Sequence, residues 1–156
     1  MAYRINEGDA IPAFRIKDSE GYEITDEDLV GSPVVIYFYP QDDTPGCTKE
    51  ACSFRDNLAR LEALDALVIG ISPDSSESHD QFQSKYDLNF TLLADQNMEL
   101  CKKFDVVHDG KLERITFVVD SEGIIQWIER PVDVSGHVDR VIQAVQELRA
   151  SDTLLP

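Results

Sequence analysis

Two cysteines that lie five residues apart, Cys47 and Cys52, are the side chains in this 156-residue chain that best fit covalent chemistry. Cys47 falls in the first turn of an expected amphipathic helix. There, unpaired backbone N–H groups and the positive end of the helix dipole favour the thiolate over the thiol. A thiolate is nucleophilic, whereas a buried thiol at an ordinary helix start is inert. Taken alone, the position of Cys47 fits either interpretation.

Cys52 supplies a possible second half of a redox cycle. On an ideal helix, Cα atoms five residues apart are separated by roughly 8.6 Å, whereas a disulfide needs Cα atoms within about 7 Å. The two cysteines therefore cannot pair while the helix is intact, although local unwinding of its first turns would let them. The alternative is a small helix residue that fills space beside Phe54 and Arg55.

The segment that precedes Cys47 could build a pocket around its sulfur. Thr44 offers a hydroxyl that could donate to the sulfur or to an oxygen bound beside it, and Pro40 could shield the pocket from water. Pro45 and Gly46 stop strand pairing and let the backbone turn tightly. This segment therefore has the composition expected of a loop that forms a pocket around Cys47.

The acidic pair Asp42–Asp43 lies in the same segment and has two interpretations. It either solvates the loop or helps a reducing partner to dock.

Strand and helix patterns alternate along the chain and would position this loop. A continuous apolar run over Pro33–Tyr39 predicts a strand buried on both faces. Apolar spacing predicts a helix over Cys47–Leu64. The other predicted strands are Ala13–Lys17, Ala66–Ile71, Phe90–Leu93, Arg114–Asp120 and Ile124–Glu129, the last two forming a hairpin. The other predicted helices are Glu77–Tyr86, Met98–Phe104 and Val134–Leu148, with a loose tail from about Ser151.

Buried strands that alternate with helices predict an α/β fold with a mixed central sheet flanked by helices, in one domain over residues 1–156. A thioredoxin-like fold fits this order of elements, and an open doubly wound sheet is the main alternative. No Gly-x-Gly-x-x-Gly motif follows a predicted strand and no Walker-type Gly–Lys–Thr occurs, so nucleotide binding lacks support.

The chain is strongly acidic, with 30 Asp+Glu against 14 Lys+Arg and a formal net charge of −16. This balance argues against nucleic acid as a partner, because phosphate binding requires clustered cations. Its simplest explanation is a well-solvated surface. The first thirty residues lack the basic start and apolar run of a signal peptide, and the longest apolar stretch is too short to cross a bilayer. These features predict a cytoplasmic protein without membrane contact.

The pattern Pro40-x-x-x-Thr44-x-x-Cys47 resembles the active-site motif of the peroxiredoxins. Longer matches over Tyr37–Arg55, Gly70–Asp74 and Arg114–Gly123 look like the peroxiredoxin Q, or bacterioferritin comigratory protein, subfamily. Together the matches span about Gly8 to Leu148, which is most of the chain.

The resemblance implies a thioredoxin-like fold and a thiol peroxidase with an antioxidant role in cell redox homeostasis. Cys47 would be the peroxidatic cysteine, whose thiolate attacks the peroxide and becomes a sulfenic acid. Cys52 would be the resolving cysteine, which forms an intramolecular disulfide with Cys47.

The same resemblance implies roles for four other residues. Thr44 would orient the peroxide, and Pro40 would shield the pocket. Arg114 would supply a fixed positive charge that favours the thiolate and stabilises the developing oxyanion. Sequence alone cannot bring Arg114 to Cys47, and an edge charge would also explain it. Glu50 would hold the guanidinium, although a first-turn Glu is also explained by the helix dipole.

The implied substrates are hydrogen peroxide and alkyl hydroperoxides, and the implied reductant is thioredoxin or a similar dithiol protein. No metal, haem or flavin cofactor is implied, and the expected assembly is a monomer or weak homodimer. Two alternatives remain at this stage. One is a one-cysteine peroxidase in which Cys52 is structural, and the other is a redox-sensing or chaperone-like binding protein without turnover.

Three residues depart from the family pattern. Cys101 could be an alternative resolving cysteine, but a buried core thiol is the preferred interpretation. Asp105 stands where the family often has Gly, which makes the end of the preceding helix less certain. Ile115 occupies a position where a small residue is expected.

The three histidines, His79, His108 and His137, are far apart and lack metal-ligand spacing. None lies beside Cys47 in the sequence, so nothing local predicts a catalytic Cys–His pair.

Overall fold

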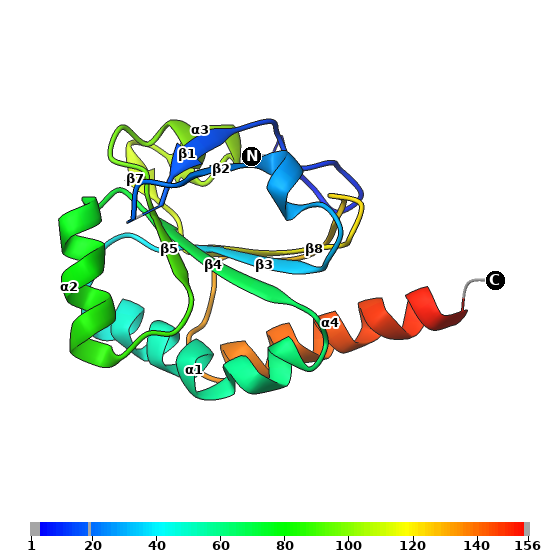
Figure 1. Cartoon of the computed structure of the whole chain (residues 1–156). Helices are drawn as coiled ribbons and strands as arrows, with labels where there is room; N and C mark the ends of the chain where they lie inside the picture. The colour runs from blue at the N-terminus through cyan, green and yellow to red at the C-terminus, as the bar shows by residue number, and fades with distance from the viewer. Residues whose placement is uncertain (1–3, 19, 155–156) are drawn as a thin grey trace.

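The computed structural model describes residues 4–18 and 20–154, with residues 149–154 described by their backbone only. A five-stranded mixed sheet with the order β5-β4-β3-β8-β9 forms its centre (Figure 1). The five strands are β3 (Val34–Phe38), β4 (Leu67–Ser72), β5 (Thr91–Ala94), β8 (Ile115–Val119) and β9 (Ile125–Glu129). Strands β3, β4 and β5 run parallel, whereas β8 is antiparallel to both β3 and β9. The mixed sheet and the predicted hairpin are thus confirmed.

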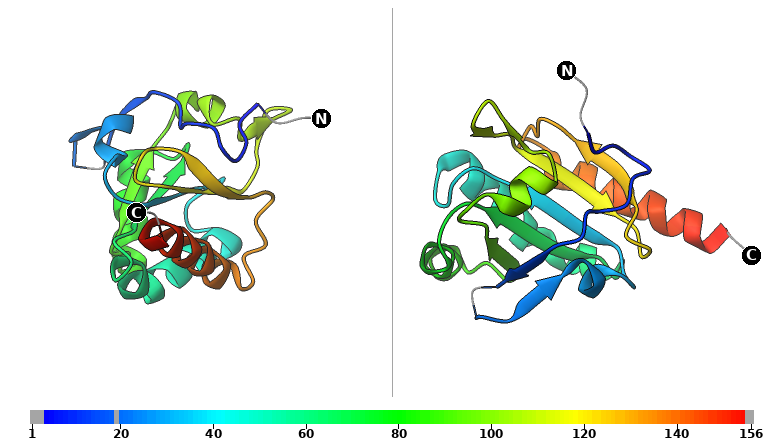
Figure 2. Two further views of the ribbon diagram at one scale, coloured as in Figure 1. Left: turned by 90° about the vertical axis from the view of Figure 1, so that its right-hand side faces the viewer. Right: turned by 90° about the horizontal axis from the view of Figure 1, so that it is seen from above.

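Helices and small strand pairs cover the two faces of this sheet (Figures 1 and 2). Helices α1 (Pro45–Glu62) and α4 (His137–Leu154) cover one face, and α2 (Ser76–Tyr86) lies near β5. On the other face lie helix α3 (Glu99–Lys103), the 3-10 turn η1 (Asp26–Leu29), and the strand pair β1 (Arg15–Lys17) and β2 (Glu23–Thr25). A further hairpin joins β6 (Val107–His108) to β7 (Lys111–Leu112).

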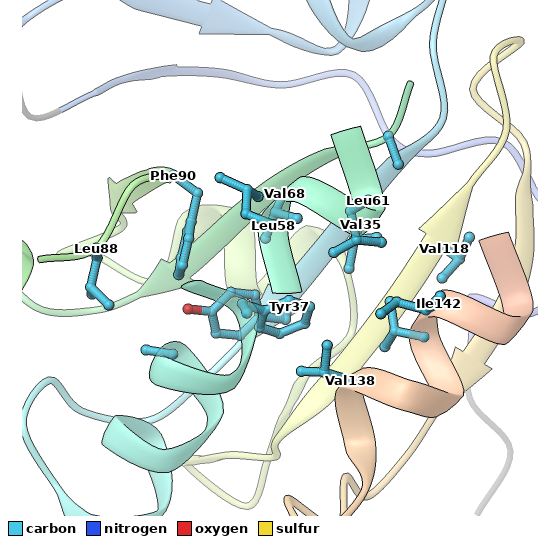
Figure 3. Packing of buried hydrophobic residues seen from close by; sticks show 14 of the residues in the cluster. Val35, Tyr37, Leu58, Leu61, Val68, Leu88, Phe90, Val118, Val138 and Ile142 are labelled. Carbon is cyan, nitrogen blue, oxygen red and sulfur yellow. The ribbon is translucent and has the colours of Figure 1, made fainter. Parts of the chain in front are cut away.

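Strand β3 contributes to a hydrophobic cluster on each face of the sheet, as its continuous apolar run predicts. Val35 and Tyr37 pack with α1 and α4 (Figure 3), whereas Val34, Ile36 and Phe38 pack with α3 and the N-terminal segments. Because side chains alternate along a strand, burial on both faces fixes the register of β3 against its neighbours.

One row of paired residues crosses the sheet beneath α1 and α4. Tyr37 pairs with Gly70 on one side and with Thr116 on the other, and Thr116 pairs with Glu129. A Cβ atom at Gly70 would lie 2.8 Å from the ring of Tyr37, so only glycine leaves room for this buried phenol. The row therefore brings Thr116 and Glu129, two polar residues, to the face where α1 begins.

The C-terminal helix differs from its predicted extent at both ends. It begins at His137 rather than Val134, because Gly136 adopts a left-handed backbone conformation (φ +70°) that interrupts the helix. It continues through Leu154, past its predicted end at Leu148 and into the segment from Ser151 that is predicted to be a loose tail. No Gly or Pro occurs between His137 and Leu154 to stop the propagation of backbone hydrogen bonds. Residues 155–156 lie outside the described part of the chain.

No helix among the described residues is long and apolar enough to span a membrane.

Candidate active site

Cys47 lies where the central strand β3 passes into helix α1. The loop Tyr39–Thr44 joins the two elements, and α1 begins with Pro45, whose missing N–H is not needed in the first turn. The N–H of Thr48 donates to the carbonyl of Thr44 at 2.8 Å and closes that turn. Cys47 is buried, with 1% of its surface exposed. Cys47 thus lies in the first turn of a helix, as the sequence predicts, and its role stays a prediction.

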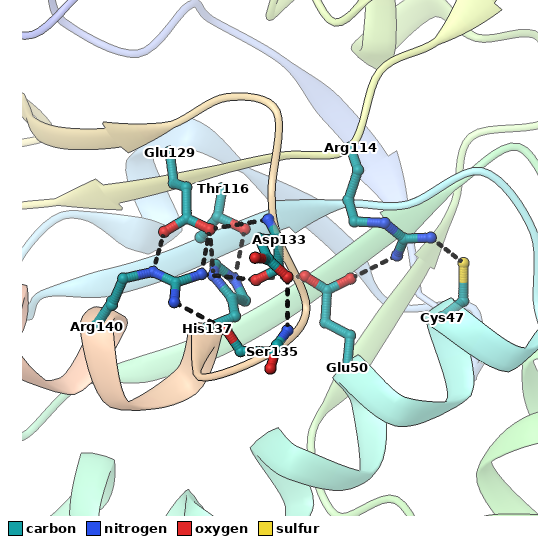
Figure 4. A network of polar contacts seen from close by, with 9 residues as sticks. All are labelled: Cys47, Glu50, Arg114, Thr116, Glu129, Asp133, Ser135, His137 and Arg140. Carbon is teal, nitrogen blue, oxygen red and sulfur yellow. Dashed lines mark hydrogen bonds and ion pairs between the residues drawn. The ribbon is translucent and has the colours of Figure 1, made fainter.

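Arg114 reaches Cys47 because of the antiparallel pairing between β3 and β8. Phe38, the last residue of β3, pairs with Ile115, the first residue of β8, so Arg114 lies at the same edge of the sheet as the active-site loop. Its Nη2 donates to Sγ of Cys47 at 3.2 Å (Figure 4). This contact places a permanent cation beside the sulfur.

Glu50 holds the other side of the same guanidinium. It lies three residues after Cys47 on α1, and its Oε1 accepts from Nη1 of Arg114 at 2.9 Å. Glu50 is almost fully buried, and burial raises its pKa to about 7, against the lowering effect of Arg114. Burial alone would lower the pKa of Arg114. Glu50 and Cys47 raise it by more than burial lowers it, so the guanidinium keeps its charge.

Gly46 makes room for this arrangement. A Cβ atom at this position would lie 3.2 Å from Nη2 of Arg114, the atom that donates to Cys47. Gly46 belongs to the first turn of α1 rather than to a tight turn before it. The sequence argument for turning freedom is therefore wrong here, and the need for glycine comes from the approach of Arg114.

Thr44 and Pro40 lie in the loop but are not joined to the sulfur by any described contact. Thr44 is half-buried, and its hydroxyl donates to the carbonyl of Gln41 at 3.1 Å. Pro40 is exposed at the end of β3. Their predicted roles toward a bound peroxide stay predictions.

Cys52 is half-buried on the continuous helix α1, and both it and Cys47 are free thiols. Because Cys47 and Cys52 are five residues apart on an intact helix, they cannot form a disulfide in this state.

Asp42 is buried and anchors the active-site loop, so the prediction that it solvates the loop is wrong. Its carboxylate accepts hydrogen bonds from Oη of Tyr39 at 2.6 Å, from Oγ of Ser78 at 2.8 Å, and from Nδ1 of His79 at 2.7 Å. Burial by itself raises the pKa of Asp42, but the hydrogen bonds from His79 and Tyr39 outweigh it and hold the pKa below its usual value. The loop is thereby tied to α2.

A possible metal site is formed by three residues, Asp42, Asp74 and His79. One nitrogen or oxygen atom from each could bind a metal ion, and these atoms lie within 4.8 Å of one another. Those atoms already have protein partners. Oδ2 of Asp74 accepts from Oγ of Ser72 and from the backbone N–H of Asp42, each at 2.7 Å. We therefore interpret this cluster as a structural anchor.

Asp43, by contrast, is exposed and contacts the end of α2. Its carboxylate accepts from Nζ of Lys85 at 2.7 Å and from Oη of Tyr86 at 2.6 Å. Its backbone is left-handed (φ +58°), a conformation that Asp tolerates better than most residues.

His137 is a buried part of the site that sequence reasoning missed. Its Nε2 lies 3.0 Å from Oγ1 of Thr116 and 3.3 Å from Oε2 of Glu50, and its Nδ1 lies 3.1 Å from Oε2 of Glu129. The predicted hairpin could have placed Glu129 opposite Thr116, but the packing of α4 against α1 has no local sequence signal.

The three departures from the family pattern have structural explanations. Cys101 is fully buried, and burial together with a hydrogen bond to Asp95 raises the pKa of its thiol, as expected for a core cysteine. Asp105 takes the left-handed position after α3 (φ +58°) in place of glycine. Its side chain accepts from the backbone N–H of Arg4 at 2.8 Å. Ile115 fills the core cluster on the α3 face of the sheet.

Comparison with known proteins agrees with this geometry. The profile of the AhpC/TSA family matches residues 7–128. Peroxiredoxin Bcp of Bacillus subtilis is 41% identical over 151 residues, which cover 90% of this chain and 95% of that protein. The structure of a PrxQ mutant from Xylella fastidiosa has a TM-score of 0.89 and 32% identity, covering 94% of this chain and 98% of its own. The bacterioferritin comigratory protein of Xanthomonas campestris, studied for alkyl peroxide reduction, has a TM-score of 0.83 and 36% identity, covering 87% and 92%.

The chain belongs to the AhpC/TSA family. Its relatives and structural neighbours place it among the peroxiredoxins of the Q/Bcp type, so it is an enzyme and a peroxidase. The predicted family and thioredoxin-like fold are confirmed, and the doubly wound alternative is wrong.

Proposed function

We propose that this peroxiredoxin reduces hydrogen peroxide and organic hydroperoxides through Cys47, with Cys52 as the resolving cysteine and thioredoxin or a similar dithiol protein as the reductant. The observation that carries the proposal is the 3.2 Å contact between Nη2 of Arg114 and Sγ of Cys47 at the start of α1. It places a cation and a helix N-terminus on one buried sulfur.

In the first step, the Cys47 thiolate attacks one oxygen of the peroxide. The S–O bond forms as the O–O bond breaks, which oxidises the sulfur to a sulfenic acid and releases an alkoxide or hydroxide that takes up a proton. Arg114 stabilises the charge that develops on the oxygens. Thr44 would orient the bound peroxide and Pro40 would shield it from water, roles carried over from the family motif.

In the second step, the sulfur of Cys52 attacks the Cys47 sulfenic acid. An S–S bond forms, and the sulfenic oxygen leaves as water with the proton of the Cys52 thiol. The two residues lie on one continuous helix, so the first turns of α1 must unwind before this bond can form. The backbone bond between Thr48 and Thr44 is one of those that must open.

In the third step, a dithiol protein transfers two electrons and restores both thiols. One of its thiolates attacks the disulfide to form a mixed disulfide, and its second thiol releases the reduced enzyme.

Peroxide consumption in the presence of thioredoxin tests the proposal. The wild type should turn over, and Cys47→Ser should lose activity completely because no other described thiol contacts a cation at a helix start. The matched control is Cys101→Ser, which should retain turnover because that thiol is buried away from the site. Unchanged activity of Cys47→Ser would refute the proposal.

The same assay separates the remaining alternatives. If Cys52→Ser turns over fully with thioredoxin, the one-cysteine peroxidase is correct and Cys52 is structural. If the wild type reacts once with peroxide but is not recycled by any dithiol, the protein acts as a redox sensor or binding protein.

The setting of this chemistry is also part of the proposal. A cytoplasmic location would supply dithiol reductants and keep the three thiols reduced. A single domain over residues 1–156, acting as a monomer or weak homodimer without a cofactor, is what we expect in solution.

A further inference from the structure

The buried histidine behind Glu50 is not used by the proposed cycle. His137 is 1% exposed, and it lies between Glu50 on α1, Thr116 on β8 and Glu129 on β9 (Figure 4). A buried polar group of this kind needs a defined set of donors and acceptors. The positions of its protons follow from its neighbours.

The Nδ1 atom of His137 must carry a proton. Its partner Glu129 is held by Arg140 through two hydrogen bonds, from Nε at 2.7 Å and from Nη2 at 2.8 Å. Burial raises the pKa of Glu129, but the hydrogen bonds and the charge of Arg140 oppose it, and the pKa lies below its usual value. Because this carboxylate can only accept, Nδ1 of His137 donates to it.

The Nε2 atom therefore carries a lone pair when the imidazole is neutral, and it lies 3.0 Å from the hydroxyl of Thr116, which can donate or accept, and 3.3 Å from Oε2 of Glu50. Oε1 of Glu50 accepts from Arg114, whereas Oε2 is buried without a hydrogen-bond partner among the described residues if Glu50 is ionised. Nε2 of His137 lies 3.3 Å from this Oε2. Two acceptors at this distance repel each other, and an orphaned buried carboxylate oxygen is costly.

A proton between these two atoms removes both problems. If Glu50 is a neutral acid, Oε2–H donates to Nε2 of His137 while Oε1 still accepts from Arg114. If the proton moves to His137 instead, two full charges face each other inside the protein, which costs more desolvation than a neutral pair. Burial favours the neutral form of both groups. It raises the pKa of Glu50 to about 7 and lowers that of His137 to about 4.

We propose that Glu50 carries a proton that its Oε2 donates to Nε2 of His137, which makes His137 a positioning residue for the contact between Arg114 and Cys47. This inference rests on the proposed function of Cys47. A neutral Glu50 orients the guanidinium without cancelling its charge, so that charge remains available to the sulfur and to the departing oxygen. Loss of the proton creates a carboxylate that competes with the thiolate for Arg114.

Every element around Glu50 contributes charge or polarity to this balance. Cys47 lies on the same helix, Arg114 and Thr116 lie at β8, Glu129 lies on β9, Tyr37 lies on β3, and His137 and Arg140 lie on α4. Only Glu50 among them has a carboxyl pKa raised to about 7. A titration seen at His137 that disappears in Glu50→Gln is therefore assigned to Glu50.

Nitrogen NMR of the histidine side chains tests the proton directly. In the wild type, His137 should be neutral with the proton on Nδ1, and its Nε2 shift should change with a midpoint near pH 7 as Glu50 titrates. Glu50→Gln should abolish that change, and His79 provides an internal comparison. A doubly protonated His137 at neutral pH, or an Nε2 shift that is flat across this range, would overturn the proposal.

Two substitutions separate positioning through Glu50 from simple packing. The amide of Gln reaches about as far as Nε2 of histidine, whereas the amide of Asn reaches about as far as Nδ1. His137→Gln should therefore keep the inflection near pH 7 in the pH profile of peroxide reaction. His137→Asn should move it lower by about one pH unit, equivalent to the loss of one hydrogen bond.

If His137 acts only through its contact with Glu129, the two variants should behave the other way round. Asn keeps that contact and Gln does not, so His137→Gln would be the more strongly affected variant. That ranking would contradict the proposal. Failure of the proposed function would look different, since a wild type that does not consume peroxide leaves the NMR result on His137 and Glu50 intact. If both substituted proteins fail to fold, the wild-type and Glu50→Gln spectra still decide the question.

Discussion

The guanidinium of Arg114 donates to the sulfur of Cys47 at 3.2 Å, although 67 residues separate them in the chain. The pairing of Phe38 with Ile115 produces this contact, because it brings the start of β8 to the end of β3. The same guanidinium donates to Glu50 at 2.9 Å. The surroundings of the Cys47 sulfur thus depend on a sheet register and on a carboxyl group one helical turn away.

Substitution of Arg114 tests the electrostatic part of this arrangement. Arg114→Gln should lower the rate of the peroxide reaction by about 10²- to 10³-fold, the usual cost of losing a group that stabilises developing charge. Arg114→Lys should recover only part of the rate, because an ammonium cannot hold Glu50 and Cys47 through two planar N–H groups. Stopped-flow kinetics would measure both, with the exposed Arg60→Gln as control. Equal rates for Arg114→Gln and wild type would contradict this role.

Substitution of Gly46 should separate activity from stability. A Cβ atom would lie 3.2 Å from Nη2 of Arg114, which cannot retreat without loosening its contacts with Cys47 and Glu50. Gly46→Ala should therefore slow the peroxide reaction. Alanine also favours the helix by roughly 0.5–1 kcal/mol, which offsets strain against Arg114, so the free energy of unfolding should change little. Denaturant unfolding alongside stopped-flow kinetics would check this, and an unchanged rate would show that Arg114 is free to shift.

The buried pair of Asp42 and His79 should make the active-site loop sensitive to substitution. Both ring nitrogens of His79 face oxygens that accept, Oδ2 of Asp42 at 2.7 Å and the carbonyl of Leu93 at 3.0 Å. His79→Ala leaves a buried carboxylate without this donor and should lower the free energy of unfolding by about 3–5 kcal/mol. Asp43→Ala, at the exposed neighbour, should cost much less, because water screens exposed charge pairs. Similar losses at both positions in urea unfolding would contradict the anchoring role.

The same pair gives a pH dependence with a defined sign. The folded state lowers the pKa of Asp42, because hydrogen bonds from His79 and Tyr39 outweigh the effect of burial. Its contribution to stability is therefore fully present above the unfolded value of about 3.9 and is lost as the pH falls through the lower folded value. Acid unfolding of Asp42→Asn should lack this component, and an acid-unfolding curve identical to that of the wild type would argue against it.

Cys101 should be unreactive toward alkylating reagents in the folded protein. It is fully buried, and burial and the hydrogen bond to Asp95 raise the pKa of its thiol, so the thiolate is scarce at neutral pH. Under native conditions an alkylating reagent should modify Cys47 and spare Cys101, as peptide mass spectrometry would show. Rapid modification of Cys101 in the folded protein would restore it as a candidate resolving cysteine.

Local patterns were sufficient to predict the principal elements and the position of Cys47 at a helix start. The apolar run of β3 and the periodicity of α1 are short-range signals, and Cys47 lies at their junction. Arg114 was predicted by resemblance alone, because its proximity to Cys47 depends on strand register. Register is a property of two distant segments and is not visible in either one.

The buried polar residues were the least predictable part of the site. Asp42 and His137 are of types that usually lie at the surface or only partly inside, and their burial depends on donors from other elements. The end of α4 was missed for a different reason. A helix without Gly or Pro continues as long as its backbone bonds propagate, and the amphipathic stripe does not mark where it ends.

Disulfide mapping after one equivalent of hydrogen peroxide tests the central claim most directly. Mass spectrometry of the reduced protein treated in this way should show a Cys47–Cys52 link within one chain, with Cys101 still a free thiol. The Cys52→Ser variant should instead hold Cys47 as a sulfenic acid. A link to Cys101, or a persistent Cys47 sulfenic acid in the wild type, would contradict the proposed two-cysteine cycle.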